Sequence, residues 1–324
     1  MRKPNLLPGA FAIPLIAAAC GGATPGPSGD RVELPGSTFY PEGVAIARDG
    51  KTYVASILTG AVVEIDRGKA TPTELVAAGA IGTSAVGLLA SADGDPDDLL
   101  WQCVGTYGTD TLPSVAGIDR ATGTEVVRHT FPPQADGSTA GLCNEVTEDA
   151  AGNLYVTDSF GARVLRIVAA DRRNPDHIAV WAAGPELAPA PMGFGANGIA
   201  FDGAGAILVD NTSTGALIQI AINADGSAGP LAPLALTRAL VGPDGLRLVE
   251  PGVAVVVEQY AGALTRIDLA AQPIAATTLR DGLRDPTSLD VADGNAWVSE
   301  GQLSHIFDMT APALPFTVVR VPLD

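Results

Sequence analysis

The sequence predicts an all-β fold, a six-bladed β-propeller of four-stranded antiparallel blades, on three observations. One pattern of short strands and turns recurs along the chain, with aligned copies that begin at residues 42, 86, 144, 197, 244 and 287. The copies begin 43 to 58 residues apart, close to the length of a four-stranded propeller blade. Runs of β-branched or apolar residues follow the copies and are candidates for the fourth, outer strands.

Each copy consists of a short alternating strand, a turn with Asp or Gly, a β-rich strand, a Gly-containing turn and a third strand. Copies at residues 42–65, 144–167, 197–220 and 244–267 align without a gap. The copy from Val86 carries an acidic insertion at residues 93–98, which we expect to be a solvated hairpin tip rather than a second cation site. The copy from Thr287 is shorter, and its third strand is expected to contain His305.

The outer strands also have candidates in the sequence. We expect them at residues 73–78, 124–131, 177–182, 274–279 and 316–321, with a weaker candidate at residues 231–236. Residues 31–34 (RVEL) resemble an outer strand and are expected to pair with the last blade, which would close the ring and protect its edges. Two β-sandwich domains are the competing architecture, but they would not explain one motif that recurs six times in register.

The start of the chain has the pattern of a bacterial secretory signal rather than a membrane span. Arg2 and Lys3 precede an almost uncharged run, residues 6–19, which is too short to cross a bilayer. Residues 15–20 (LIAAAC) resemble a lipobox, so Cys20 is expected to become the lipidated N-terminus.

Three segments follow from this assignment. Residues 1–20 are the lipoprotein signal peptide, residues 21–30 are a flexible tether rich in Gly and Pro, and residues 31–324 form the propeller. The protein is therefore expected to be exported and lipid-anchored in the bacterial cell envelope, on the periplasmic or extracellular face. Its contact with the membrane would be through the N-terminal lipid only.

Charge and cysteine content restrict the partners and the redox state. A net charge of −17 argues against nucleic acid, because phosphate binding needs clustered Lys and Arg. Only Cys103 and Cys143 remain in the propeller. Export makes a disulfide between them feasible, and two buried thiols are the alternative. A closed propeller has no free edge that requires a partner, so we expect a monomer.

Equivalent positions of the blades meet around the axis of a propeller, so the first residues of the copies form one ring. We call it the mouth ring; its members are Glu42, Val86, Asn144, Asn197, Asp244 and Thr287. Singly, such residues usually cap turns. Together, its two carboxylates and two amides offer hard oxygen ligands without the His or Cys that zinc selects. The sequence predicts a divalent-cation site at the mouth, with Ca²⁺ favoured over Mg²⁺ and coordination positions left for water or substrate.

A second polar ring is expected about 14 positions later, at the ends of the second strands, and consists of Ser56, Asp158, Asn211, Glu258 and Glu300. In this ring, Asp158 and Glu258 could support the metal ligands or act as a general base. Turn-capping or solvated carboxylates are the alternative interpretation of both residues.

The mouth-ring residues and their neighbours resemble the SMP-30/gluconolactonase/LRE-like family of six-bladed calcium propellers. The resemblance covers residues 41–307, and its motifs are YPEGVA at Glu42, CNEV at Asn144, ANGIAFD at Asn197 and GPDGL at Asp244. It implies that these four residues bind the metal, and that the Asp of the PDG motif, Asp244, serves as base or nucleophile. The family's enzymes are mostly lactonases or esterases. The repeat also resembles NHL repeats, which often serve only for binding.

Other hydrolase chemistries find less support. His129 and His177 fall in expected outer strands, and His305 in an expected third strand, so no paraoxonase-like histidine pair is predicted at the mouth. The sequence has no GxSxG motif, which argues against a nucleophile-elbow serine hydrolase. The favoured function is hydrolysis of lactones or related esters, on a small neutral or weakly polar substrate whose carbonyl a cation polarises. A non-catalytic, tethered calcium-binding propeller is the alternative.

Overall fold

The computed structural model describes residues 30–323 apart from residues 67–68, 70, 92–97 and 106–111. Cys20, most of the tether and nearly all of the insertion at residues 93–98 therefore lie outside the described residues. No helix in the described part of the chain is long and apolar enough to span a membrane.

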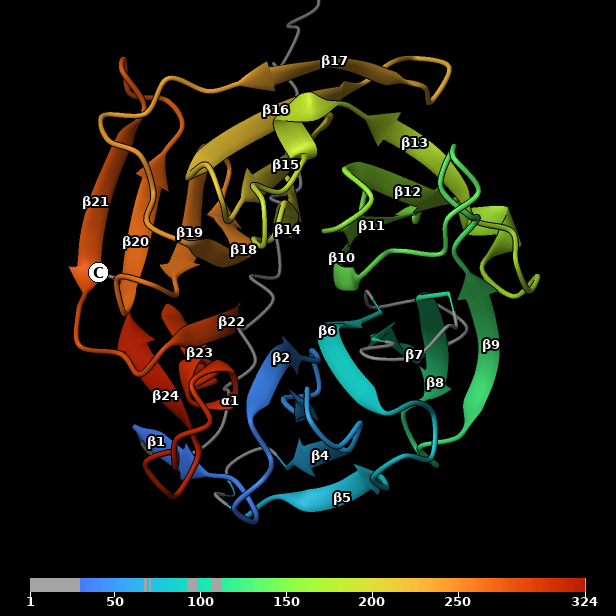
Figure 1. Ribbon diagram of the computed structural model, residues 1–324. Helices are drawn as coiled ribbons and strands as arrows, with labels where there is room; N and C mark the ends of the chain where they lie inside the picture. Colours follow the sequence, from blue (N-terminus) through green and yellow to red (C-terminus); the bar gives the residue numbers. More distant parts are fainter. Residues whose placement is uncertain (1–29, 67–68, 70, 92–97, 106–111, 324) are drawn as a thin grey trace, which may run out of the picture.

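The structure is a six-bladed β-propeller, and each blade is a four-stranded antiparallel sheet (Figure 1). The innermost strands are β2 (Pro41–Ile46), β6 (Ser84–Ala90), β10 (Cys143–Glu148), β14 (Ala196–Phe201), β18 (Pro243–Glu250) and β22 (Pro286–Ala292). The second strands are β3 (Thr52–Ser56), β7 (Leu99–Gly105), β11 (Leu154–Asp158), β15 (Ala206–Asn211), β19 (Val253–Glu258) and β23 (Asn295–Glu300). The predicted fold class and the six predicted blade starts are confirmed.

The outer half of each blade follows the same order. The third strands are β4 (Val62–Ile65), β8 (Ser114–Asp119), β12 (Arg163–Ile167), β16 (Ala216–Ile222), β20 (Ala263–Asp268) and β24 (Thr317–Pro322). The outermost strands are β5 (Thr73–Val76), β9 (Glu125–Thr130), β13 (Ala179–Ala183), β17 (Ala228–Pro233), β21 (Ala275–Arg280) and β1 (Arg31–Glu33). Three short helices lie in connections: η1 (Ala169–Asp171), η2 (Pro185–Leu187) and α1 (Ser304–Phe307).

The last blade is closed by the first strand, as expected. Strand β1 pairs with β24 in the order β1-β24-β23-β22, with Arg31 opposite Val319. The prediction for the rest of this blade was wrong in one respect. His305 lies in helix α1, and residues 316–321 fall in β24, the third strand rather than the fourth. Strand β1 occupies the outer position that the sequence predicts for residues 316–321. The blade therefore has its four strands without a further one.

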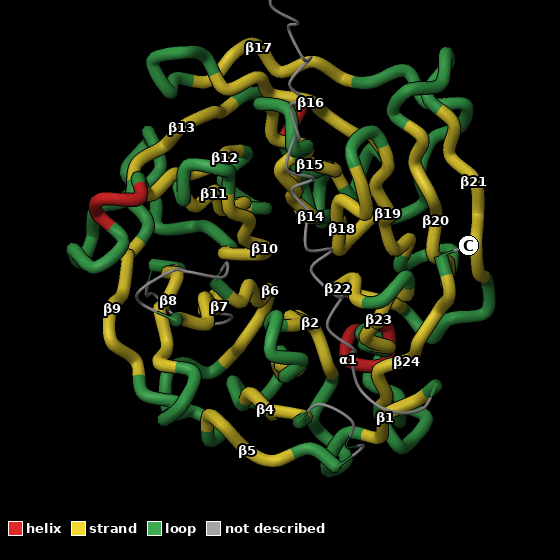
Figure 2. The backbone as a smooth tube through the Cα atoms, turned by 180° about the vertical axis from the view of Figure 1, so that it is seen from behind, coloured by secondary structure: helices red, strands yellow, loops and turns green. Residues whose placement is uncertain are grey.

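The hydrophobic core is divided among the contacts between neighbouring blades. Strand residues alternate between the two faces of a blade, so both faces can carry apolar side chains to a neighbour. Each of the six buried clusters draws its residues from two consecutive blades. Trp101 and Val156, for example, belong to one cluster although they come from blades two and three. Packing between blades therefore fixes where each inner strand stands around the axis (Figure 2).

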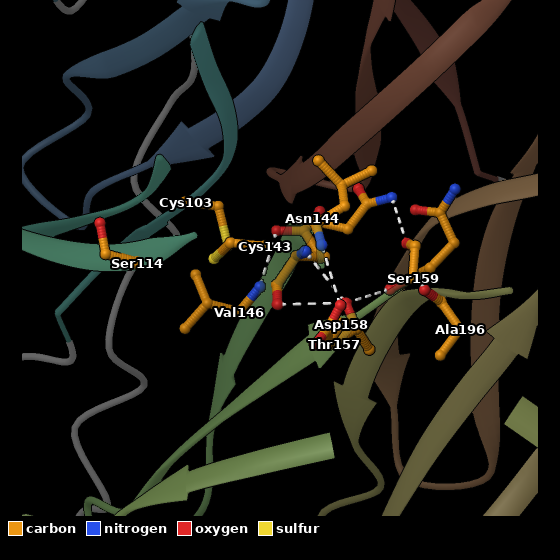
Figure 3. The surroundings of a disulfide bond; sticks show 12 residues. Cys103, Ser114, Cys143, Asn144, Val146, Thr157, Asp158, Ser159 and Ala196 are labelled. Atoms are coloured by element: carbon orange, nitrogen blue, oxygen red, sulfur yellow. Dashed lines mark hydrogen bonds between the residues drawn. A yellow bond between two sulfur atoms is a disulfide. The ribbon is translucent and has the colours of Figure 1, made fainter. Parts of the chain in front are cut away.

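A disulfide joins Cys103 of β7 to Cys143 of β10, across the contact between blades two and three. Both cysteines are fully buried. Figure 3 shows that this bond lies beside Asn144, the mouth-ring residue that follows Cys143 in the sequence. Of the two states left open by the sequence, the structure has the disulfide.

Candidate active site at the propeller mouth

In every blade, the innermost strand has a bulge at the mouth. In β2, pairing with β3 stops after Pro41 and resumes at Val44, so Glu42 and Gly43 are the two unpaired residues. The same shift occurs at the start of all six inner strands. Bulges re-aim side chains, and here the first unpaired position of each bulge holds the mouth-ring residue.

The second unpaired position explains the glycines that follow mouth-ring residues. A Cβ at Gly43 would lie 2.3 Å from the carbonyl oxygen of Val86, and one at Gly198 would lie 2.1 Å from that of Asp244. The neighbouring inner strand therefore passes too close for a side chain at these positions. Glu145 and Ser288 occupy this position in the third and sixth blades.

The four predicted metal ligands come together at one pocket. Glu42, Asn144, Asn197 and Asp244 line a cavity of about 350 Å³, and each is 4–5% exposed. Val86 of the mouth ring also lines it. Thr287 is turned to the backbone instead, where its hydroxyl lies 3.1 Å from the carbonyl oxygen of Pro41.

The two asparagine side chains are held in fixed orientations by hydroxyl groups. Nδ2 of Asn144 donates to Oγ of Ser159 at 2.8 Å, and Nδ2 of Asn197 donates to Oγ1 of Thr212 at 2.9 Å. Each hydroxyl donates in turn to a carbonyl of the next blade, Ala196 for Ser159 and Pro243 for Thr212. Because the amide nitrogens are turned to these hydroxyls, both amide groups have fixed orientations, and Oδ1 of Asn197 has no partner among the described residues.

The carboxyl groups of the ring are poorly solvated and repel each other. Burial raises the pKa of Glu42 well above its ordinary value, and the charges of Asp244 and Glu145 raise it further. Burial likewise raises the pKa of Asp244 well above its usual range, and Glu145 adds to the effect, whereas a hydrogen bond from Asn197 opposes it. A positive charge between these groups would relieve the repulsion.

The donor set fits a divalent cation. Oε2 of Glu42 and Oδ1 of Asn197 are buried and have no hydrogen-bond partner among the described residues. Buried oxygens normally have a hydrogen-bond partner or bind an ion, and a divalent cation would supply the contact that these two lack. Among the described residues, no three or more His, Cys, Asp or Glu side chains are grouped as a metal site, so a site at the mouth depends on its amide oxygens. Two carboxylates and two amides form a hard-oxygen set of the kind Ca²⁺ and Mg²⁺ take.

The second polar ring does not face the pocket, contrary to our expectation. In the third, fourth and fifth blades, the inner-strand residue just before the bulge pairs with Asp158, Asn211 and Glu258. None of these three lines the cavity. The residues that reach the mouth lie one position later, Ile57 in the first blade and Gln259 in the fifth. Because side chains alternate along a strand, an error of one residue turns the side chain to the other face.

Asp158 and Glu258 instead hold loops to their blades. Asp158 is fully buried, pairs with Arg163 at 2.8 Å and accepts from the backbone N–H groups of Leu142 and Gly161. Glu258 pairs with Arg238 at 2.6 Å. Burial would raise the pKa of Glu258, but hydrogen bonds from Arg238 and other donors outweigh it and hold the pKa below its ordinary value. Both carboxyl groups accept hydrogen bonds away from the pocket, so the geometry gives neither a catalytic role.

The three histidines are also remote from the pocket. His129 is buried in β9, where Nε2 lies 3.0 Å from the carbonyl oxygen of Arg172. His177 is exposed and pairs with Asp171 at 3.1 Å, and His305 contacts Thr310. None of them lines the cavity, in agreement with the prediction that no histidine pair serves this site.

A charged layer that the sequence did not reveal lies deeper along the inner strands. Arg247 of β18 reaches Glu145 of β10 at 3.3 Å and Asp290 of β22 at 3.7 Å, and donates to the carbonyl oxygen of Leu88 in β6 at 3.2 Å. One guanidinium thus links four blades beneath the mouth ring. Glu145 stands where four of the other five blades have glycine, and this departure from the repeat is the sequence signal for the layer.

The described walls of the pocket are largely apolar. Phe194 comes from the connection before β14, whereas Leu303, Ile306 and Phe307 come from the segment around helix α1. Ile57, Leu58 and Leu142 complete the apolar lining. Phe194 and Leu142 precede the copies of their blades, and Leu303, Ile306 and Phe307 belong to the part of the sixth copy that contains helix α1 instead of the expected strand.

Comparisons with known proteins show similarity at the level of the fold. No family model matches the chain, and no curated protein matches it by sequence. Among solved structures, a luciferin-regenerating enzyme is similar with a TM-score of 0.65 at 12% identity, over 90% of this chain and 94% of that one. A gluconolactonase from Xanthomonas campestris has a TM-score of 0.62 at 15% identity, over 90% of this chain and 89% of that one.

Structures of proteins described with other activities share the architecture. Virginiamycin B lyase from Staphylococcus aureus matches with a TM-score of 0.58 at 16% identity, over 91% of this chain and 88% of that one. One fold can carry several chemistries, so function has to be argued from the site. The neighbours include gluconolactonase and luciferin-regenerating enzyme, which confirms the predicted resemblance to SMP-30-like six-bladed propellers.

Proposed function

We propose that this protein is an exported, lipid-anchored hydrolase of lactones or related esters that depends on a divalent cation, with Ca²⁺ preferred. The observation that carries the proposal is the convergence of two buried carboxylates and two oriented amides on the floor of one pocket. The unpartnered oxygens of Glu42 and Asn197 support a cation there. The signal and lipobox pattern at Cys20 supports export and anchoring.

Glu42, Asn144, Asn197 and Asp244 would hold the cation. A divalent cation at this place supplies electrophilic stabilisation of the negative charge that develops on an ester carbonyl oxygen. The chain itself positions this set, because Ser159 and Thr212 fix the amides and the bulges fix the strand positions.

Asp244 is the proposed proton acceptor. In hydrolysis, water adds to the carbonyl carbon, the bond from this carbon to the ring oxygen breaks, and one proton moves from the water to the leaving oxygen. Asp244 lies in the pocket and has no arginine or lysine partner among the described contacts that would neutralise it. It can accept the proton from the attacking water and return it to the leaving oxygen.

The test uses the chain from Asp30 onward, treated with chelator and then titrated with Ca²⁺ or Mg²⁺. Binding is measured by calorimetry, and hydrolysis is measured by proton release on a panel of sugar, alkyl and aromatic lactones. Asp244→Asn is expected to lose turnover while its thermal unfolding remains cooperative. Asp225→Asn, at an exposed hairpin turn of blade four, is the matched control.

Two outcomes would contradict parts of the proposal. Turnover that survives both chelation and Asp244→Asn would rule out this site as the centre of catalysis. Tight cation binding without turnover on any lactone would make the protein a tethered binding propeller instead.

A further inference from the structure

The pocket above the four predicted ligands has two chemically different parts. Its floor is polar and carries the only ionisable side chains among the described lining residues, Glu42 and Asp244. No Lys, Arg or His of the described chain lines it. Apart from a bound cation, a substrate with a carboxylate or phosphate would therefore find no ion-pair partner among the described lining residues.

The walls above this floor are formed by aromatic and aliphatic side chains. Phe194 is partly buried, and its ring stacks on Phe160 with centroids 5.5 Å apart. The Phe194 centroid also lies 6.5 Å from that of Phe307, which comes from helix α1. Phe194 thus contacts both other rings, and Phe194 and Phe307 line the cavity whereas Phe160 does not. We call Phe160, Phe194 and Phe307 the aromatic arc.

Polar wall groups are few. Thr83, Ser84 and Gln259 are the lining residues with polar side chains besides the four on the floor. A polyhydroxylated sugar lactone has several hydroxyl groups, each of which loses water on binding and needs a partner. An aliphatic or aromatic arm needs none, and gains from contact with the arc in proportion to its buried area.

We infer that the preferred substrate is a neutral lactone or ester with an apolar arm, alkyl or aryl, that lies on Phe194 and Phe307 while its carbonyl group faces the polar floor. The cavity of about 350 Å³ lies in the range of small-molecule sites and can hold a ring with such an arm. This inference rests on the proposed function of the same pocket, and it adds the substrate class and two residues that set specificity.

The test is a series of γ-lactones whose alkyl side chain lengthens one methylene at a time, with glucono-δ-lactone as the polar reference. On the Ca²⁺-loaded protein, kcat/KM is expected to rise about three- to fourfold for each methylene that the arc covers, and then to level off. Phe307→Ala should flatten this dependence on chain length. Phe307 is 62% exposed, so this variant is expected to fold, and Phe194→Ala provides a second case. Val180→Ala, on exposed strand β13 outside the pocket, is the matched control.

Failure of this inference can be told apart from failure of the proposed function. Hydrolysis that favours glucono-δ-lactone, or that is indifferent to chain length, would overturn the inference and leave the hydrolase in place. If no lactone is hydrolysed, binding of the corresponding γ-alkyl lactams to the Ca²⁺-loaded protein decides. Affinity that rises with chain length and falls in Phe307→Ala would support the apolar-arm pocket without catalysis, and affinity independent of chain length would overturn it.

Discussion

The side-chain amide of Asn197 donates to the hydroxyl of Thr212 at 2.9 Å, and this contact decides which end of the amide faces the mouth. If the hydroxyl were absent, the amide could turn its nitrogen toward the pocket, where a donor cannot bind a cation. Thr212 is therefore a positioning residue for the predicted ligand set.

We expect Thr212→Val to lower the affinity for Ca²⁺ about tenfold or more, since partners that orient metal ligands typically contribute a factor of this size. Thr212→Ser, which keeps the hydroxyl, should retain the affinity. Thr214→Val, an exposed threonine of the same turn, is the control. Calorimetric titration of the chelated protein measures all three, and equal affinities for the Val and Ser variants would disprove the role of the hydroxyl.

Glu42→Gln should have opposite effects on the free and the cation-bound protein. The carboxylate of Glu42 is buried with its pKa well raised by burial and by Asp244, so its charge destabilises the cation-free fold at neutral pH. Without cation, the variant is expected to be more stable than wild type at neutral pH. It should also lose the stabilisation that Ca²⁺ gives the wild type. Urea unfolding of both proteins, with chelator and with Ca²⁺, measures the expected gain in stability without cation and the expected loss of stabilisation by Ca²⁺.

The same two carboxyl groups predict how pH acts on stability. Since the pKa values of Glu42 and Asp244 are raised in the folded state, the cation-free fold binds more protons than the unfolded chain. Their contribution to the free energy of unfolding is therefore fully present at low pH and is lost as the pH rises from about 4 through the folded pKa values. Bound Ca²⁺ competes with these protons, so its stabilising effect should grow as the pH rises. Thermal unfolding of wild type and Glu42→Gln across this range, with and without Ca²⁺, is the measurement; a Ca²⁺ effect independent of pH would contradict it.

Asp158 should matter for stability and not for chemistry. It is buried with Arg163, and removal of one partner of a buried pair typically costs about 3 kcal/mol or more. Asp158→Asn is thus expected to lower the melting temperature by several degrees while the folded fraction keeps its kcat/KM. A large loss of kcat in a fully folded Asp158→Asn protein would restore the catalytic role that we first expected.

The disulfide between Cys103 and Cys143 should stabilise the contact between blades two and three. The two cysteines are 40 residues apart, and by the loop-entropy relation closing such a loop contributes about 4 kcal/mol. The double variant Cys103→Ala/Cys143→Ala is expected to unfold at lower denaturant concentration. Because Cys143 precedes Asn144, Ca²⁺ affinity should fall as well, whereas unchanged affinity would show that the bulge of β10 holds its shape without the bond.

The repeat allowed the fold to be predicted from the sequence. Six copies in register also predict that Glu42, Asn144, Asn197 and Asp244 lie around one axis. The two general base candidates do not line the pocket, because the end of a strand could be located only to within one residue. Asp158 and Glu258 lie one position before the residues that face the mouth, and their carboxyl groups bind arginine side chains instead. Phe307 was expected in a strand of the sixth blade, so its contact with the mouth was not predicted. The misplaced third strand of the last blade has a related cause, because helix α1 and its loop stand where other blades continue directly into a strand.

The pairing of β1 with β24 also constrains when the molecule can fold. Arg31 of the first strand and Thr317 of the last are in contact although they lie 286 positions apart in the sequence. During synthesis, the inner blades can form from local hairpins as they emerge, but the final sheet needs both ends of the described chain at once. Contacts of such long separation are formed slowly, and until then the unpaired edges of the incomplete ring are open to other chains. Strand β1 therefore stays without its partner until β24 has been translated, and during this time its edge is open to misassembly.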